Sequence, residues 1–347
     1  MTAELQQPVK ALVDVEEEED LFGNKYRSGV LINRDVFTEN LHTIFQDATL
    51  EQLVGMITNE YQELLDYARL CKGMRGASRK LSLLFNPHRL DTRTQTSKMS
   101  LLQAMRESPS FRSGLARATI MRVQEKLNPA EVFWLTIQLG INGVDLVNEF
   151  PPTAARDICI RYGLSRDSRV LDPCAGWGGR MAGCSVVVDS YTCYDPSTLT
   201  AKGLGNLSGF LNRARGGDFE GLVFCQPYED SDEIEDWYDI SLTSPPYYDS
   251  EIYSDEDTNS LNRYGSFDSW VDGFYLPLLD KTMRQLKPGA PFIINIGDRK
   301  YPLTDRMMKH AEIMGYSVRR VNGGVTNSAG LGKEKDMGEK FFEIRTN

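Results

Sequence analysis

The spacing of apolar residues divides the chain into a helical first part and a second part in which strands and helices alternate. In the first part apolar side chains recur three or four positions apart over 38–72, 101–122 and 129–139. This spacing matches the 3.6-residue turn of an α-helix. The stretch 73–98 is basic and irregular, with glycine and proline breakers. The pattern predicts a mainly helical domain over residues 38–147.

The second part, residues 148–347, carries short apolar runs separated by helical stretches. The expected strands are 170–171, 186–188, 191–194, 222–225, 239–243, 292–296 and 340–345. A long helix is expected over 266–286, where Lys287-Pro288-Gly289 ends it. Strands that alternate with helices predict an α/β fold with a parallel, doubly wound sheet.

Charge is unevenly distributed along the chain. The net charge is −10, and residues 16–20 are a continuous acidic run, which predicts an acidic, partly disordered tail over residues 1–37. Residues 1–65 carry a balance of −9 and residues 129–347 one of −10, whereas residues 66–128 carry +9. A local excess of positive charge attracts a polyanion even when the net charge is negative, so the basic segment is a candidate surface for nucleic acid.

Composition excludes several classes of protein. Hydrophobic residues make up 41% of the chain, enough for a sizeable core. No apolar run approaches the roughly 20 residues that cross a bilayer, and no secretory signal is expected. The six cysteines form no C-x-x-C pair and there are three histidines. We therefore expect no metal site, no membrane contact and reduced thiols, as in a cytoplasmic protein.

A glycine-rich turn follows the first expected strand of the second part. The segment Asp172-Pro173-Cys174-Ala175-Gly176-Trp177-Gly178-Gly179 lets the backbone approach a ligand. It is neither G-x-G-x-x-G nor followed by Gly-Lys-Ser/Thr, which disfavours a phosphate cradle. The next strand ends at Asp195-Pro196, about 20 residues beyond the turn, where an acidic residue is the expected partner of a ribose diol. A helix N-cap is a second role open to Asp195.

The segment Ser244-Pro245-Pro246-Tyr247 directly follows the strand 239–243. Two prolines fix the backbone and remove two amide donors, so carbonyl groups remain to accept hydrogen bonds. A hydroxyl before them and an aromatic ring after them complete a small cup that suits a planar ring with an exocyclic amine. We call residues 244–247 the amine cup. An ordinary proline turn is the alternative, and the place at a strand's carboxyl end favours the ligand role.

Together the glycine turn and the amine cup resemble the S-adenosylmethionine-dependent amino-methyltransferases of DNA. The segment Phe150-Pro151-Pro152-Thr153 resembles the third cofactor motif of that family, in one of its circular orders. The run 244–254, with Trp270 and 286–289, resembles methylases often carried by bacteriophages. The resemblance covers roughly residues 148–347 and implies a Rossmann-like class I methyltransferase sheet. It also implies the cytoplasm of a bacterium or of a phage-infected host.

The resemblance assigns roles to individual residues. Ser244 and the Pro245 carbonyl would accept from the target amine, and Tyr247 would stack on a flipped base. Glu229 is a substitute for an acidic residue that the family has near the cofactor's adenine. The residues expected to bind the cofactor are Phe150, Pro151, Thr153, Asp172, Pro173, Ala175, Gly176, Gly178, Asp195, Pro196 and Glu229.

The resemblance implies double-stranded DNA as substrate, with N4 of cytosine favoured over N6 of adenine because serine precedes the two prolines. Base extrusion needs contacts to the phosphate backbone. The candidates in the basic segment are Arg75, Arg79, Lys80, Arg89 and Arg93; an alternative is a basic face that pairs with acidic parts of the same protein. Other substrates remain open, namely RNA bases or a protein glutamine amide, as does a silent cofactor-binding subunit. The oligomeric state, monomer or dimer, also remains open.

Overall fold

A computed structural model describes residues 13–19, 25–32, 46–74, 76–78, 80–94, 99–109, 149–233, 237–298, 300–321 and 339–346, with a few single positions between them. The chain divides into two compact units. The first comprises Met1–Asn59 and Leu90–Leu146, and the second Glu60–Arg89 and Val147–Asn347. Residues 60–89, expected in the helical domain, therefore belong to the unit that carries the sheet. Tyr67 and Leu70 pack in its core.

The first unit contains a β-hairpin within the segment expected to be an acidic, partly disordered tail. Strand β1 (Val13–Glu19) pairs antiparallel with β2 (Lys25–Ile32). Glu17 is opposite Arg27 and Glu19 opposite Lys25 in the register. The acidic, partly disordered tail expected over residues 1–37 stays a prediction.

The helical part of the first unit has short helices with defined starts. Helix α2 (Leu50–Ile57) begins with a capping box formed by Thr49 and Gln52, and α5 (Leu101–Glu107) with one formed by Ser100 and Gln103. Strand β3 (Arg93–Thr94) lies between them in sequence. The helix expected over 38–72 is interrupted at Thr58, whose extended backbone separates α2 from α3 (Glu60–Cys71). Most of the helix expected over 129–139 lies outside the described residues.

The second unit is built on a sheet of seven described strands in the order β10-β11-β9-β7-β4-β5-β6. Strand β11 is antiparallel to both neighbours, and the other pairs are parallel. This is a Rossmann-like α/β fold, with the strand order reversing between β4 and β7. Its strands are β4 (Arg169–Asp172), β5 (Ser190–Tyr194), β6 (Glu220–Phe224), β7 (Ile240–Thr243), β9 (Phe292–Gly297), β10 (Tyr316–Val321) and β11 (Glu339–Thr346).

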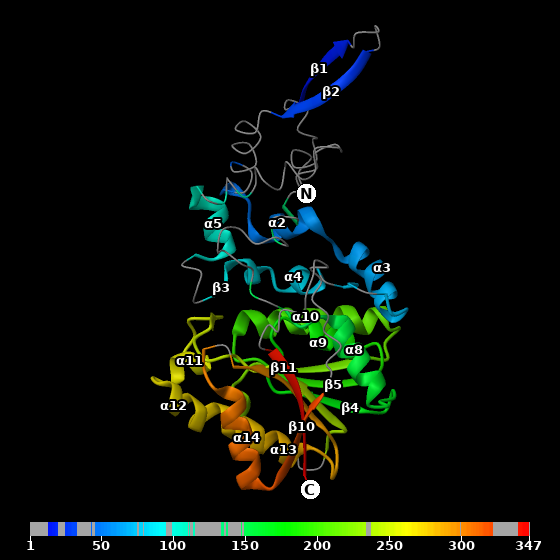
Figure 1. Cartoon of the computed structure of the whole chain (residues 1–347). Coiled ribbons are helices and arrows are strands. Elements are labelled where there is room, and N and C mark those ends of the chain that lie inside the picture. The colour runs from blue at the N-terminus through cyan, green and yellow to red at the C-terminus, as the bar shows by residue number, and fades with distance from the viewer. Residues whose placement is uncertain are drawn as a thin grey trace. The chain divides into compact units, whose positions relative to one another are not determined.

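Helices cover both faces of this sheet (Figure 1). Neighbouring strand residues point to opposite faces, so Val170 and Ile293 join one core while Leu171 and Ile294 join the other. The first face carries α3 (Glu60–Cys71), α4 (Leu81–Phe85), α8 (Pro152–Arg161), α9 (Gly179–Cys184) and α10 (Thr198–Ala214). The other elements are η4 (Tyr228–Asp230), β8 (Glu251–Ile252), α11 (Ser260–Arg263), α12 (Phe267–Trp270), η5 (Val271–Tyr275), α13 (Leu276–Gln285) and α14 (Leu303–Met314). The 3-10 turn η3 spans Pro87–Asp91.

The expected strands are confirmed with one exception. Residues 186–188 form a turn after α9, and Val188 is buried in the first-face core. Three valines favour a strand by propensity, but here they pack as a connection. Strand β10 was not expected. The helix expected over 266–286 is present as α12 and α13, joined by the wide turn η5.

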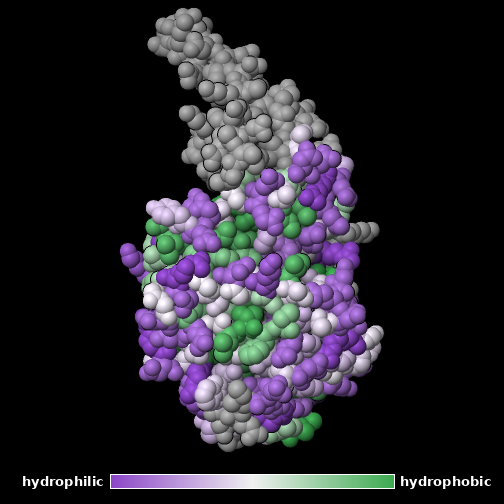
Figure 2. Space-filling view, turned by 180° about the vertical axis from the view of Figure 1, so that it is seen from behind, coloured by the Kyte–Doolittle hydropathy of each residue, from purple (hydrophilic) through white to green (hydrophobic). Residues whose placement is uncertain are grey.

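Figure 2 shows that hydrophilic residues predominate on one face of the molecule, where apolar residues gather in small groups. Among the described residues, the most exposed large apolar side chains are Ile313 and Tyr61, on different helices. No helix within the described part of the chain has the length and apolar character needed to cross a membrane.

Candidate active site

The candidate site lies at the carboxyl ends of β4 and β7. These strands are neighbours, and the chain leaves β4 toward β5 on one side and β7 toward β9 on the other. Open α/β sheets bind ligands in the crevice that such a reversal creates. The glycine turn (residues 172–179) begins at the last residue of β4, and the amine cup follows β7. The fold therefore brings the two predicted motifs to one edge of the sheet.

The glycines of the turn serve different purposes. Gly176 has φ +54°, and a Cβ placed on it would meet no atom within 4 Å. Gly178 has φ +91°, and its Cβ would come within 2.4 Å of a Leu207 methyl group on α10. Gly178 is therefore required by helix packing, whereas the space beside Gly176 remains open to a ligand.

Asp172 is fully buried and its carboxylate is saturated by donors. Arg180 Nε donates at 2.7 Å, the Tyr191 hydroxyl at 2.5 Å and the Thr243 hydroxyl at 2.7 Å. Burial alone would lower the pKa of Arg180, but the charge of Asp172 outweighs it and raises that pKa. Each carboxylate oxygen of Asp172 therefore already has partners within the protein, and the cofactor contact predicted for this residue stays a prediction.

Thr243 links the glycine turn to the amine cup. Its hydroxyl donates to Asp172 and accepts from the Cys174 amide at 3.1 Å. Because Thr243 directly precedes Ser244, one side chain fixes the distance between the two motifs. Thr243, Arg180 and Tyr191 were not predicted as functional residues. The signal available for Thr243 was a hydroxyl residue at the end of a buried strand, directly before Ser244 and the two prolines.

Asp195 lies at the end of β5 and faces the glycine turn. It accepts from the Gly176 amide at 3.2 Å and from the Ser197 amide at 3.0 Å. Burial raises the pKa of this carboxyl to about 7, against the lowering effect of the two amides. The N-cap of α10 is Ser197, so the alternative role of Asp195 as N-cap is not the one found, although Asp195 accepts from the amide of that cap residue. Its predicted ribose contact stays a prediction.

The segment Phe150–Thr153 reaches the same edge. Pro151 is the N-cap of α8, and α8 packs closely on α9. A Cβ on Gly179 would lie 2.1 Å from the Phe150 carbonyl oxygen, so glycine permits this approach. The Phe150 ring meets Phe341 of β11 edge to face at 5.7 Å. The third predicted motif therefore lies against the end of the glycine turn.

The amine cup has one defined side-chain contact at its start. The Ser244 hydroxyl donates to Asn295 Oδ1 at 3.4 Å, and Asn295 Nδ2 donates to the Lys340 carbonyl at 3.4 Å. Asn295 is the one polar residue within the apolar strand β9. With its proton directed to Asn295, the Ser244 oxygen presents lone pairs as an acceptor.

The two tyrosines after the prolines differ in environment. Tyr247 is 7% exposed and belongs to the second-face core, so little of its ring is available for stacking in this structure. Tyr248 has φ +56°, a rare conformation for an aromatic residue, and lies within 5.1 Å of the Tyr301 ring centroid. Backbone strain of this kind gathers at functional sites. The stacking role of Tyr247 stays a prediction, and Tyr248 joins it as a candidate.

Glu229 lies in η4, after β6. Arg263 Nη1 pairs with it at 2.8 Å, and burial raises the pKa of Glu229. The segment is held by Lys281, whose buried ammonium donates to the Tyr228 carbonyl at 2.7 Å and to the Ser231 carbonyl. Glu229 is thus fixed in place, and its predicted adenine contact stays a prediction.

The basic residues predicted to contact DNA do not form one described surface. Arg75 and Arg79 lie outside the described residues. Lys80 belongs to the second unit, whereas Arg93 belongs to the first. Arg89 is 6% exposed, pairs with Glu149 at 3.1 Å and donates twice to the Val147 carbonyl. The predicted DNA contact of Arg89 is therefore wrong, because its guanidinium is buried and already bonded to groups of the protein.

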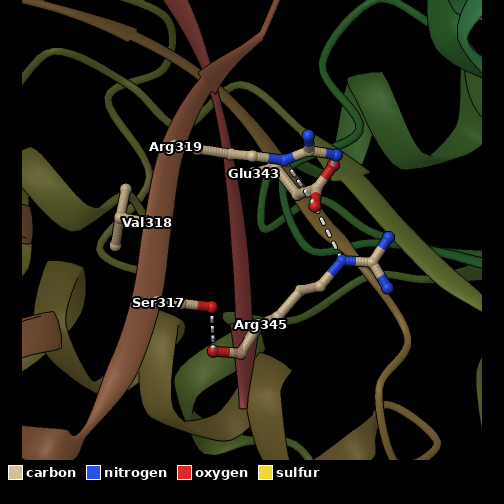
Figure 3. Close-up of a pocket in the computed structure, with 5 residues that line it drawn as sticks. All are labelled: Ser317, Val318, Arg319, Glu343 and Arg345. Carbon is tan, nitrogen blue, oxygen red and sulfur yellow. Dashed lines mark hydrogen bonds and ion pairs between the residues drawn. The ribbon is translucent and has the colours of Figure 1, made fainter. Parts of the chain in front are cut away.

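A cavity of about 430 Å³ lies elsewhere, against β10 and β11 (Figure 3). Figure 3 shows the guanidinium groups of Arg319 and Arg345 directed at the carboxylate of Glu343. Glu343 pairs in register with Ile293, near the start of β9. This cavity is therefore at the amino ends of the parallel strands, opposite the candidate site.

Metal and thiol chemistry find no support in the described part of the chain. It contains no group of three or more histidine, cysteine or acidic residues suited to a metal ion. Cys174 lies in the glycine turn, and burial raises the pKa of its thiol well above the ordinary value. A thiol with a raised pKa stays protonated, and because the thiolate is the nucleophile, Cys174 is a poor one.

Comparisons with known proteins give a likeness in fold. No family model matches the chain, and no curated protein sequence matches it. A solved rRNA methylase from Streptococcus thermophilus is 11% identical, with a TM-score of 0.35, over 58% of this chain and 98% of its own. A tRNA methyltransferase from Aquifex aeolicus is 12% identical, with a TM-score of 0.37, over 57% and 69%. A SAM-dependent O-methyltransferase from Thermotoga maritima is 12% identical, with a TM-score of 0.39, over 58% and 68%.

Likenesses at these identities and TM-scores carry no information about substrate or site residues. The assignment of the fold rests on the strand order of the chain itself, β10-β11-β9-β7-β4-β5-β6, with β11 antiparallel.

Proposed function

We propose that the second unit is an S-adenosylmethionine-dependent methyltransferase whose acceptor is the exocyclic amine of a DNA base, with N4 of cytosine favoured. The observation that carries this proposal is the Thr243 hydroxyl, bonded at once to Asp172 and to the Cys174 amide. This contact supports the proposal because it joins the segment proposed to accept the amine to a glycine turn with open space beside Gly176. The strand reversal at β4 and β7 supports the same location.

The residues present fit the cofactor. Asp195 offers a carboxylate to the ribose hydroxyls, and the backbone at Gly176 leaves room for the methionine end. S-adenosylmethionine, when bound, supplies a methyl group activated by its sulfonium. The chain's own task is then to hold the acceptor amine in line with that group and to exclude water, which is catalysis by orientation.

The amine cup can perform that orientation. The nitrogen of an exocyclic amine is a poor nucleophile because its lone pair is delocalised into the ring. Acceptance of its two protons by the Ser244 oxygen and the Pro245 carbonyl favours a pyramidal nitrogen, with the lone pair free to attack. The contact between Ser244 and Asn295 supports this role, since it directs the serine proton away from the amine. Tyr247 or Tyr248 would hold the extruded ring by stacking.

Labelled S-adenosylmethionine tests the proposal. The purified protein is incubated with DNA, RNA and protein fractions, and the methylated product is identified by mass spectrometry. We expect N4-methylcytosine in DNA; N6-methyladenine instead would change the target base and keep the DNA amine as acceptor. If the label is found only in RNA or only in protein glutamine, the acceptor is RNA or glutamine and the proposed DNA acceptor is wrong. Tight cofactor binding without any transfer would indicate a silent subunit.

The Ser244→Ala variant tests the amine cup itself. Loss of one acceptor in the transition state should lower kcat about 100-fold, while affinity for S-adenosylhomocysteine is retained. Ser317→Ala, a hydroxyl deletion at the opposite end of the sheet, is the matched control and should leave kcat unchanged. An unchanged kcat in Ser244→Ala would contradict the assignment of the cup.

A further inference from the structure

The loop over residues 253–259 contacts both turns that line the candidate cofactor site. The Tyr253 ring lies 6.0 Å from the Trp177 ring in the glycine turn, centroid to centroid. The Thr258 hydroxyl donates to the Pro196 carbonyl at 3.0 Å. Glu256 accepts from the Thr198 amide at 3.0 Å and from the Thr198 hydroxyl at 2.8 Å. In Figure 1 this segment is the yellow chain just before α11.

Glu256 satisfies a donor that the local sequence leaves open. The first amides of a helix have no partner within the helix, and a carboxylate is stabilised there. At the start of α10, Ser197 accepts from the Thr200 amide and Asp195 accepts from the Ser197 amide. The Thr198 amide receives its acceptor from Glu256, 58 residues away in the chain. The turn that carries Asp195 therefore depends on the loop that follows the amine cup.

The loop is braced internally, so Glu256 does not act as an isolated side chain. The Asn259 side chain donates to the Ser254 carbonyl at 3.2 Å, and the Asn262 side chain to the Glu256 carbonyl at 2.9 Å. The Glu256 amide donates to the Ser254 hydroxyl at 3.1 Å. If the Glu256 carboxylate loses its contacts with Thr198, the loop would therefore detach as a unit, because its internal hydrogen bonds remain.

We propose that Glu256 is a positioning residue that holds the 253–259 loop on the turn of Asp195, so that the loop retains the ribose end of the cofactor. This inference rests on the proposed cofactor site. The Glu256 contacts tie the segment after the amine cup to the ribose turn, and cofactor exchange requires them to open. Loops that close an active site in this way often govern release.

Hydrogen exchange of the Thr198 amide tests the contact without any ligand. The variant Glu256→Ala should expose that amide, and its exchange should be at least about tenfold faster than in the unaltered protein. Glu256→Gln keeps one acceptor oxygen and should restore much of the protection. Asp257→Ala removes the exposed neighbouring carboxylate and is the control. Unchanged exchange in Glu256→Ala would overturn the inference.

Dissociation of S-adenosylhomocysteine tests the consequence. We expect Glu256→Ala to release it about tenfold faster, with Glu256→Gln between the two and Asp257→Ala unchanged. Faster Thr198 exchange with an unaltered dissociation rate would overturn retention by the loop. If the unaltered protein binds no S-adenosylhomocysteine, the proposed function fails, and retention of the cofactor by the loop falls with it. The Thr198 exchange would still decide whether the Glu256 contact exists.

Discussion

The two ends of the sheet hold carboxylates under opposite conditions. At the carboxyl end, Asp195 has two backbone amides as donors, and burial raises its pKa to about 7. At the amino end, burial would raise the pKa of Glu343, but hydrogen bonds from Arg319, Tyr162 and Arg345 outweigh it and lower the pKa to about 2. The side chain of Glu343 is 3% exposed.

This comparison separates a candidate binding residue from a structural one. Both carboxylate oxygens of Glu343 already accept hydrogen bonds from protein donors, so no acceptor site remains for a ligand. Asp195 is half-buried with weaker compensation, and a carboxylate in that condition gains from an added donor such as a ribose hydroxyl. The candidate site is therefore at the carboxyl end, although the described cavity lies at the amino end.

The largest predicted effect belongs to Asp172, the saturated carboxylate at the carboxyl end. Asp172→Ala leaves the buried guanidinium of Arg180 without its partner, and we expect the free energy of unfolding to fall by about 4 kcal/mol. Asp218→Ala removes a carboxylate with 68% of its side chain exposed and is the control. Urea denaturation measures both. A loss below about 1 kcal/mol in Asp172→Ala would show that the network can rearrange.

Glu343→Gln should cost roughly 3 kcal/mol at neutral pH, since its lowered pKa reports stabilisation of the ionised form. The sign follows from linkage. The stabilisation is complete above the ordinary carboxyl pKa and is lost as pH falls toward about 2. Unfolding of the variant and of the unaltered protein should therefore converge in acid. A difference that does not depend on pH would contradict the ion-pair account, and affinity for S-adenosylhomocysteine should stay unchanged.

Asp195 should show its influence in the pH dependence of cofactor affinity. The pKa of about 7 means that the carboxyl gains a proton as pH falls through neutrality. Because the ionised form is the better acceptor, affinity for S-adenosylhomocysteine should rise about tenfold between pH 6 and pH 8 and then level off. Calorimetry in a series of buffers measures this rise. Asp195→Asn should flatten the profile, and a steep profile in that variant would assign the titration to another group.

Much of the fold could be predicted because the sheet is apolar and regularly patterned. The runs that became β4, β5, β7 and β9 are buried strands bounded by breakers, which is the strongest sequence signal for a parallel sheet. The failures have local causes. The valines at 186–188 have strand propensity but only enough length for a turn, and the extended backbone at Thr58 interrupts the helix expected over 38–72.

The site could be predicted only as far as short motifs describe it. The glycine turn, Asp195 and the amine cup are each contiguous in sequence, and the fold brings them to one edge. Contacts between distant segments could not be predicted, such as Thr243 with Cys174 or Glu256 with Thr198. Arg89 was misassigned because a count of charges does not distinguish an exposed cation from one buried against Glu149.

Calorimetric titration with S-adenosylhomocysteine at about pH 8 tests the central claim most directly, by comparing the unaltered protein with Asp195→Asn and Glu343→Gln. We predict binding by the unaltered protein, about tenfold weaker binding by Asp195→Asn, and no change for Glu343→Gln. Absence of binding to the unaltered protein, or equal affinity in all three, would contradict the assignment of the carboxyl end as the cofactor site.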